Sequence, residues 1–510
     1  MSGFTRRGVI AGGMALASAP ALARSRVTTI VTAPVGRFEG RREGGISRFL
    51  GVEYATARRF LAPEPVAPWR DTRPAMDFGP SCPQRGGGRF PQSEDCLTLN
   101  IWTPDPDARA RRPVMVYFHG GAYATGTVAD PQNDGQALAR GQDVVVVTVN
   151  HRLNAFGYLY LARLDPRFAD SGNLGQLDLI LALQWVRDNI AAFGGDPGKV
   201  MVFGQSGGGA KIATLMGMPA ARGLFHRAAT MSGQQVTASG PLNATRRARA
   251  YLEAVRASAP ADLLDMPVEA LVEGLGATDP VLGGGLYFGP VLDMKWLQRH
   301  PFWPDANPQS NAIPMLLGNT HDETRAFFGP DHRLLQGLSW DNLPERMAPE
   351  LRVDVHPEHV MAEYRRMFPV YTPEQVFFAA TTAGRSWRGQ VEEADARARA
   401  GAPTWVYQLD FASPVEPWRG APHMLDIPLV FGILVAEGSL SGTGPASQRV
   451  SRIMMDAFGR FARAGDPGWE RYTLPERQTM IFDEQPRLAS DPRREERELF
   501  ATVPYVQPGT

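Results

Sequence analysis

The chain has 510 residues, of which 43% are hydrophobic and 21% are charged, values that exclude a disordered chain, a coiled coil and a collagen-like repeat. Lysine plus arginine number 53 and aspartate plus glutamate number 53, so the formal net charge is +0. Nucleic-acid-binding proteins usually carry a basic excess, so this balance argues against nucleic acid as a partner. It favours partners that are small and uncharged, or that are bound by the shape of a pocket rather than by an electric field.

The first 23 residues have the pattern of a secretory signal. Arg6 and Arg7 precede an apolar run, and a small-residue cleavage site ends at Ala23. The run is shorter than the ~20 residues needed to span a bilayer. We therefore expect residues 1–23 to be a twin-arginine-type signal peptide. Residues 24–510 are then the mature protein, a single domain that is periplasmic or secreted and has no stable membrane anchor.

Cysteine use fits this expectation. The chain has two cysteines, Cys82 and Cys96, which are too few for a disulfide-stabilised scaffold. They form either one bridge or two free thiols, and an oxidising compartment favours the bridge.

Short apolar runs alternate with helical stretches in the mature chain, which predicts an α/β fold. Continuous apolar strands are typical of a parallel sheet that helices cover on both faces. A helix is predicted at 177–189, and the helix-rich stretches 240–300 and 330–400 are predicted to be insertions covering the sheet. The predicted strands are residues 114–118, 144–150, 199–203, 313–317 and 405–410.

A glycine-rich segment, His119-Gly120-Gly121-Ala122-Tyr123, directly follows the first of these strands. Small side chains let a substrate carbonyl approach backbone N–H groups, which can stabilise a developing oxyanion. Gly121 and Ala122 are the candidate donors in this loop. A glycine-rich turn that merely ends the strand is the alternative.

The candidate nucleophile is Ser206, in the one G-x-S-x-G motif of the chain, Gly204-Gln205-Ser206-Gly207-Gly208. A strand is predicted before it and an apolar helix after it, which is the context that a nucleophile elbow requires. The helix N-terminus beyond Ser206 favours negative charge. The N–H of Gly207 is therefore the third candidate oxyanion donor.

A phosphate-binding loop is a competing interpretation of the same segment. Gly204, Gly209 and Lys211 nearly match G-x-x-x-x-G-K-[ST]. However, the lysine comes one residue late, and Ile212 stands where magnesium binding needs a hydroxyl group.

A nucleophile of this type needs an acid and then a histidine later in the chain. The loop after the strand at 313–317 offers Asp322 and Glu323, and their spacing does not choose between them. Of the late histidines, His423 follows the strand at 405–410, whereas His332 follows its acid too closely. His356 and His359 lie in a polar stretch typical of a solvated surface.

With these residues placed, the chain resembles the type-B carboxylesterase family, which includes the cholinesterases and bacterial para-nitrobenzyl esterases. The resemblance covers essentially the whole mature chain. It implies an α/β-hydrolase fold, with a large, mostly parallel central sheet flanked by helices and helical insertions over the active site. It rests on residues 49–55 (FLGVEYA), 93–100 (SEDCLTLN), 150–153 (NHRL), 172–175 (GNLG) and 193–197 (FGGDP).

The resemblance also implies roles for individual residues. The family's acid falls on Glu323, and its histidine falls on His423 in the segment Gly420-Ala421-Pro422-His423. The family's first disulfide matches Cys82–Cys96.

The elbow departs from the family's usual G-E-S-A-G at two positions. Gln205 replaces the glutamate and thereby removes a negative charge, which argues against a cationic, choline-ester-like substrate. Gly207 replaces the alanine and is expected to widen the site slightly.

The sequence therefore predicts a serine carboxylic-ester hydrolase that acts on a small-molecule ester through an acyl-enzyme. Ser206, Glu323 and His423 are its predicted catalytic residues, and no metal or cofactor is expected. The alternatives are an amidase or a detoxifying hydrolase of bulky polyesters with the same residues, and a non-catalytic binding relative. The last is disfavoured because such relatives lose one of the three residues.

Overall fold

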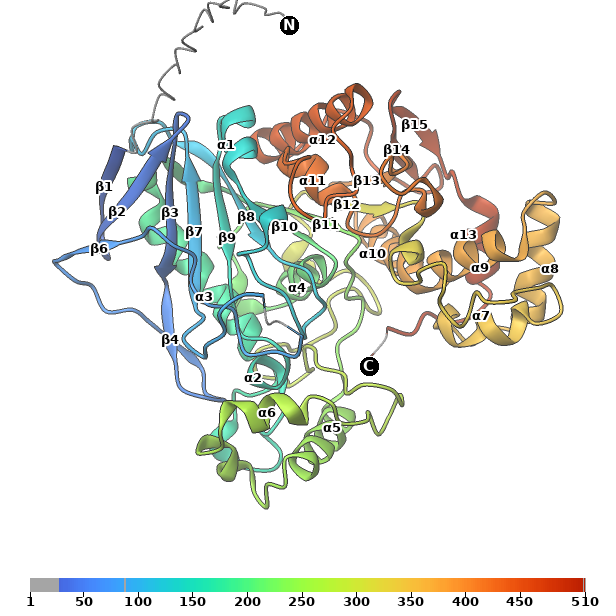
Figure 1. Cartoon of the computed structure of the whole chain (residues 1–510), viewed down its shortest axis with the longest axis horizontal. Helices are drawn as coiled ribbons and strands as arrows, with labels where there is room; N and C mark the ends of the chain where they lie inside the picture. Colours follow the sequence, from blue (N-terminus) through green and yellow to red (C-terminus); the bar gives the residue numbers. More distant parts are fainter. Residues whose placement is uncertain (1–26, 87–88, 508, 510) are drawn as a thin grey trace, which may run out of the picture.

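The computed structural model describes residues 27–86, 89–507 and 509. The predicted signal peptide, residues 1–23, lies outside this part of the chain. A 13-stranded sheet crosses the molecule in the order β1-β2-β3-β7-β9-β8-β10-β11-β12-β13-β14-β15, with β6 paired to β2 (Figure 1). A second sheet consists of β4 and β5.

The strands of both sheets have the following bounds: β1 (Val27–Ala33), β2 (Gly36–Glu43), β3 (Ile46–Glu53), β4 (Ala55–Ala57), β5 (Pro63–Pro65), β6 (Thr72–Pro74), β7 (Thr98–Thr103), β8 (Arg112–Phe118), β9 (Val145–Val149), β10 (Gly195–Gln205), β11 (Arg227–Met231), β12 (Met315–Thr320), β13 (Thr404–Leu409), β14 (Gln478–Phe482) and β15 (Arg487–Ser490).

The α-helices have these bounds: α1 (Gln136–Gln142), α2 (Asn154–Tyr158), α3 (Leu174–Asn189), α4 (Gly207–Met216), α5 (Pro241–Ala254), α6 (Val268–Gly274), α7 (Leu343–Leu351), α8 (Pro357–Met367), α9 (Pro373–Thr382), α10 (Arg388–Arg399), α11 (Asp426–Phe431), α12 (Pro445–Ala464) and α13 (Arg494–Phe500).

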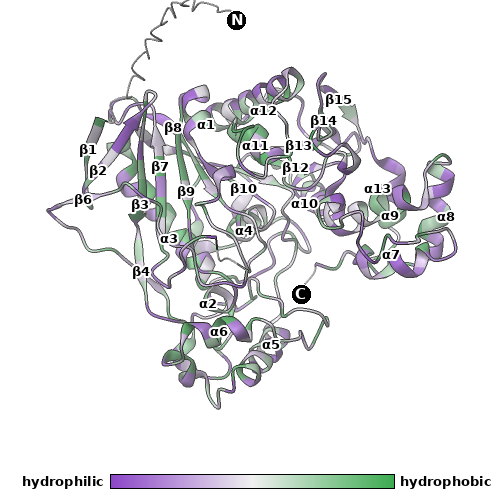
Figure 2. Ribbon diagram, viewed as in Figure 1, coloured by the Kyte–Doolittle hydropathy of each residue, from purple (hydrophilic) through white to green (hydrophobic). Residues whose placement is uncertain are grey.

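The centre of the sheet, from β9 to β14, is parallel and buried on both faces. Successive side chains of a strand point to opposite faces, so each strand contributes to two cores. In β8, Val114 and Val116 join the core that contains α3 and α4. Met115 and Tyr117 join the other core, which contains α11 and α12. This burial on both faces explains the continuous apolar runs of the sequence. In Figure 2 these runs appear as green, hydrophobic stretches in central strands such as β9.

The α/β-hydrolase fold is confirmed, and each of the five predicted strands overlaps an observed one. The edges of the sheet differ from its parallel centre. The segment β1-β2-β3-β7-β9 and the pair β14-β15 are antiparallel. The outermost of these strands, β1, β2 and β15, carry alternating or mostly exposed residues, unlike the apolar runs that marked the central strands.

Helices gather at two places outside the sheet. Helices α7, α8, α9 and α13 pack around a core of their own beyond β14 and β15, and α5 and α6 lie at the bottom of the view, below α2 (Figure 1). These groups fall largely within the predicted insertions 240–300 and 330–400. In the part of the chain that the structure describes, every helix is too short or too polar to cross a membrane.

Cys82 and Cys96 are two free, buried thiols in the structure, so the bridge expected from the resemblance is not formed there. The two thiols are joined by a hydrogen bond instead of a covalent bond. A hydrogen bond to Cys82 and burial both raise the pKa of the Cys96 thiol. The sulfur of Cys82 also accepts the backbone N–H of Leu153 at 3.2 Å.

Candidate active site

Four loops meet at the carboxyl-terminal edge of the parallel strands, the usual location of sites in open α/β sheets. The glycine-rich loop follows β8, and Ser206 follows β10. Glu323 follows β12, and His423 lies in the loop after β13. Residues far apart in sequence are brought together here because their strands are neighbours in the order β8-β10-β11-β12-β13.

Ser206 occupies a sharp turn between β10 and α4. Its φ of 54° and ψ of −122° are strained for a residue with a side chain. The turn is held from both sides: the N–H of Ser206 donates to the carbonyl of Met231 at 2.7 Å, and the carbonyl of Ser206 accepts from the N–H of Ala210 at 3.1 Å. The serine side chain is therefore presented at the N-terminus of α4, as the predicted elbow requires.

Two glycines let α4 approach the glycine-rich loop closely. A Cβ on Gly207 would lie 2.0 Å from the carbonyl oxygen of Ala122, and one on Gly208 would lie 1.9 Å from that of Phe118. The expectation that Gly207 widens the site is wrong, because the backbone of Ala122 fills the space. The missing side chain instead draws the candidate oxyanion donors together.

The glycine-rich loop has an unusual backbone. Gly121 and Ala122 have φ angles of 85° and 53°, and the N–H of Thr125 closes the turn on the carbonyl of Gly121 at 3.0 Å. Within the described chain, none of the N–H groups of Gly121, Ala122 and Gly207 donates a hydrogen bond to the protein. Three backbone donors close to Ser206 are therefore available to an external acceptor.

Glu323 and His423 form a direct pair. Nδ1 of His423 contacts Oε2 of Glu323 in a short hydrogen bond. The other carboxylate oxygen, Oε1, accepts from the side chain of Asn319 and from the backbone N–H of Thr320, both at 2.9 Å. Both oxygens of this fully buried carboxylate are thus occupied, which fixes the orientation of the imidazole.

The surroundings of Glu323 favour its charged form. Burial alone raises the pKa of a carboxyl group, but His423 and the hydrogen bonds to Glu323 outweigh burial and lower its pKa below the ordinary value. Glu323 therefore stays ionised at neutral pH, which suits a group that must stabilise an imidazolium.

The neighbouring carboxylate, Asp322, faces a different direction. It accepts the backbone N–H of Ala421 at 3.0 Å and lies 3.2 Å from Nδ1 of His321. Asp322 thus holds the loop that carries His423 without touching the imidazole. The sequence spacing did not show whether Asp322 or Glu323 faces His423. In the structure, the side chain of Glu323 points to the imidazole and that of Asp322 points away from it.

Gln205 makes a contact that the sequence did not predict. Its side-chain Nε2 lies 3.1 Å from Nε2 of His423. Because Nδ1 donates to Glu323, Nε2 is the acceptor and Gln205 the donor. The hydroxyl of Ser206 makes no hydrogen bond to another described residue. Gln205 therefore occupies the nitrogen that would have to accept the serine proton.

A cavity of about 210 Å³ opens beside the glycine-rich loop and Gln205. Met424 and Ile427, which follow His423 in the sequence, form one side of it. The polar residues Thr127, Asp130, Gln132 and Asn133 form another part of the lining. The cavity is therefore next to one of the candidate donors, Gly121, and is partly polar.

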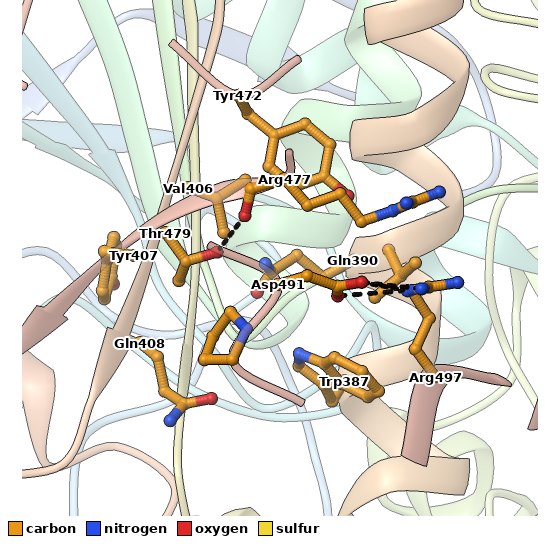
Figure 3. A pocket seen from close by; sticks show the side chains of 12 residues that line it. Trp387, Gln390, Val406, Tyr407, Gln408, Tyr472, Arg477, Thr479, Asp491 and Arg497 are labelled. Carbon is orange, nitrogen blue, oxygen red and sulfur yellow. Dashed lines mark hydrogen bonds and ion pairs between the residues drawn. The ribbon is translucent and has the colours of Figure 1, made fainter. Parts of the chain in front are cut away.

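A second cavity lies beside β13, β14 and α10 (Figure 3). It has room for about 20 Å³, roughly one water molecule. Its charged residues are paired: Arg497 binds Asp491, and Arg477 binds Asp395. This cavity is too small for a substrate.

Comparison with known proteins adds to this geometry. Residues 27–500 match the model of the carboxylesterase family. The chain is 34% identical to the para-nitrobenzyl esterase of Bacillus subtilis (strain 168) over 502 residues, which cover 92% of this chain and 98% of that protein. It is also 32% identical over 484 residues to a probable N-octanoylanthranilate hydrolase of Rhodococcus erythropolis, covering 89% of this chain and 98% of that protein.

The fold of the chain is also similar to that of a carboxylesterase of known structure. The carboxylesterase EST55 of Geobacillus stearothermophilus superposes with a TM-score of 0.83 at 35% sequence identity, covering 92% of this chain and 100% of that one.

Proposed function

Because the chain belongs to the carboxylesterase family and is a carboxylic ester hydrolase, we propose that Ser206 is the residue that attacks the ester and carries its acyl group. The observation that carries this proposal is the contact of His423 with buried Glu323 through one ring nitrogen. The other nitrogen faces the elbow at Gln205. This arrangement has the parts of a nucleophile, base and orienting acid.

In the first half of the reaction, the amide of Gln205 gives up its hydrogen bond to Nε2 of His423. Ser206 Oγ then forms a bond to the carbonyl carbon, and its proton passes to Nε2. The carbonyl oxygen becomes an oxyanion, which the free N–H groups of Gly121, Ala122 and Gly207 receive. The bond to the alcohol then breaks. His423 returns the proton to the alkoxide, and the acyl group remains on Ser206.

In the second half, water attacks the acyl-enzyme while His423 takes one of its protons. The ester bond to Ser206 breaks, the serine recovers a proton from His423, and the acid leaves. Gln205 can form a hydrogen bond with His423 in both charge states of the imidazole. Its amide N–H donates to neutral Nε2, and its carbonyl oxygen can accept from protonated Nε2.

Trapping the acyl-enzyme tests this proposal. Mixing the protein with excess p-nitrophenyl butyrate and quenching in acid should give a peptide that contains Ser206 and one added butyryl group. Hydrolysis without acylation of any residue would contradict a covalent mechanism.

Gln205 leads to a prediction about the substrate. We propose that the enzyme prefers uncharged esters, because an amide stands where the family usually has a carboxylate. In Gln205→Glu, the new carboxylate favours the imidazolium, which cannot accept the serine proton. The acid limb of kcat/KM should therefore move to higher pH by about one unit. The ratio of kcat/KM for acetylcholine to that for its neutral isostere, 3,3-dimethylbutyl acetate, should rise ~10-fold.

Gln132→Glu is the matched control, since it adds the same charge to the same cavity without contacting His423. Its acid limb should stay in place. An unchanged acid limb in Gln205→Glu would show that Gln205 does not influence the base.

We also propose that residues 1–23 direct export and that residues 24–510 are the mature, single-domain enzyme. The twin-arginine pattern of the sequence supports this proposal. Expression of the full chain in a bacterium with a twin-arginine pathway should give periplasmic activity and a mature N-terminus at Arg24. Replacing Arg6 and Arg7 by lysine should keep the protein in the cytoplasm. Equal export of that variant would contradict the assignment.

A further inference from the structure

A buried lysine lies directly behind the glycine-rich loop. Lys211 is on α4, and none of its surface is exposed. Its Nζ donates to the backbone carbonyl of His119 at 3.1 Å and lies 5.7 Å from the centre of the Tyr123 ring. Neither the proposed reaction nor the near match to a phosphate loop accounts for this side chain.

Lys211 lacks a counter-ion in the described part of the chain. No carboxylate among the described residues forms an ion pair with it, and burial alone lowers its pKa to about 7. The titratable groups that face it are His119, His151 and Tyr123. Burial first, and then Lys211, lower the pKa of both histidines, so these rings stay neutral. The cost of burying an ammonium group here is not offset by an anion from any residue that the structure describes.

Lys211 contacts or belongs to both segments that supply the candidate oxyanion donors. The carbonyl it holds belongs to His119, the first residue of the loop that supplies Gly121 and Ala122. Gly207, the third donor, precedes Lys211 by four residues on α4, so the two lie one turn apart on the same face of the helix. One side chain thus connects the loop and the helix that together supply the donors.

A neutral hydrogen-bond donor could connect these two elements without the cost of a buried charge. A charged lysine gains an advantage over such a neutral donor where it meets negative charge during function, because its ammonium group is then attracted to that charge. The oxyanion of the proposed reaction is such a charge. It would form at the N–H groups of the loop and of α4, the two elements that Lys211 connects.

We propose that Lys211 is a positioning residue of the oxyanion hole, which holds the loop from His119 to Ala122 against α4 and supplies positive potential where the substrate carbonyl oxygen gains its charge. This inference rests on the proposed function, since it needs an oxyanion to form beside Ser206.

Three variants separate the charge of Lys211 from its hydrogen bond. Lys211→Met removes both, Lys211→Gln keeps a donor for the His119 carbonyl, and Lys199→Met removes an exposed lysine of the same strand–helix unit as a control. Active enzyme is counted by labelling Ser206 with a fluorophosphonate. Because kcat is then expressed per labelled active site, a loss of folded protein is distinguished from a loss of catalytic rate.

Kinetics with p-nitrophenyl butyrate and inhibition by an alkyl trifluoromethyl ketone are then measured. In the inhibited enzyme, Ser206 Oγ adds to the ketone carbon, its proton goes to His423, and the ketone oxygen becomes an oxyanion. We expect Lys211→Met to lower kcat per active site ~10-fold or more, with KM within about twofold and ketone affinity reduced by the same factor as kcat. Lys211→Gln should recover only part of the loss, and Lys199→Met should match the wild type.

Two results would overturn the inference. Unchanged kcat and ketone affinity in folded, labelled Lys211→Met would show that the ammonium group only fills space. Full recovery in Lys211→Gln would show that the hydrogen bond suffices without the charge. Failure of the proposed function is distinguishable from both, because the wild-type protein itself would then not be labelled at Ser206.

Discussion

Replacing Ser206 by alanine should lower kcat for p-nitrophenyl butyrate by roughly 10⁴-fold or more. The change removes the only atom proposed to bond to the acyl group, while the backbone donors and the cavity stay in place. It should leave the fold intact, because the elbow is held by backbone hydrogen bonds to Met231 and Ala210 rather than by the serine side chain.

The measurement compares steady-state hydrolysis of the wild-type and variant proteins at equal concentration, with circular dichroism and thermal unfolding as the test of folding. Ser206→Cys is a useful companion, since it restores a nucleophile at the same position. Wild-type rates in folded Ser206→Ala would exclude Ser206 as the nucleophile.

The second large effect is expected for Glu323→Gln, which should lower kcat by about 10³- to 10⁴-fold. The amide can still accept from Asn319 and Thr320, but it would present an N–H to Nδ1 of His423. The imidazole would then turn to the tautomer that carries its proton on Nε2. In that form it cannot accept the proton of Ser206, and the carboxylate in direct contact with the imidazolium is lost.

Asp322→Asn is the matched control for this prediction, since it neutralises the adjacent carboxylate in the same loop. Asp322 contacts Ala421 and His321 but not the ring of His423, so kcat should fall less than about tenfold. Both variants are assayed for kcat and for labelling of Ser206. A larger loss in Asp322→Asn than in Glu323→Gln would reverse the assignment of the acid.

The parts of the site that the sequence predicted are those encoded locally. The elbow at Ser206 follows from glycines placed between an apolar strand and an apolar helix, and the glycine-rich loop follows from its position directly after a strand. The central strands were recognisable because burial on both faces leaves a continuous apolar run. The outermost antiparallel strands, such as β1 (Val27–Ala33), are largely exposed and carry no such signal.

The parts that escaped prediction depend on contacts between distant residues. Asp322 and Glu323 are adjacent, so spacing could not show which carboxylate faces His423; only the family resemblance favoured Glu323. The contact of Gln205 with His423 joins side chains 218 positions apart. The effect of Gly207 was misjudged for the same reason, because the space beside it is filled by the backbone of Ala122 from another loop.

The most direct test of the account is to locate the reactive residue chemically. The protein is incubated with a small fluorophosphonate, loss of ester hydrolysis is followed, and the phosphorus adduct is mapped by peptide mass spectrometry. The account predicts a single adduct on Ser206, formed with loss of fluoride and in proportion to the loss of activity. An adduct on a different residue that accompanies the inactivation, or sustained hydrolysis by fully labelled protein, would contradict it.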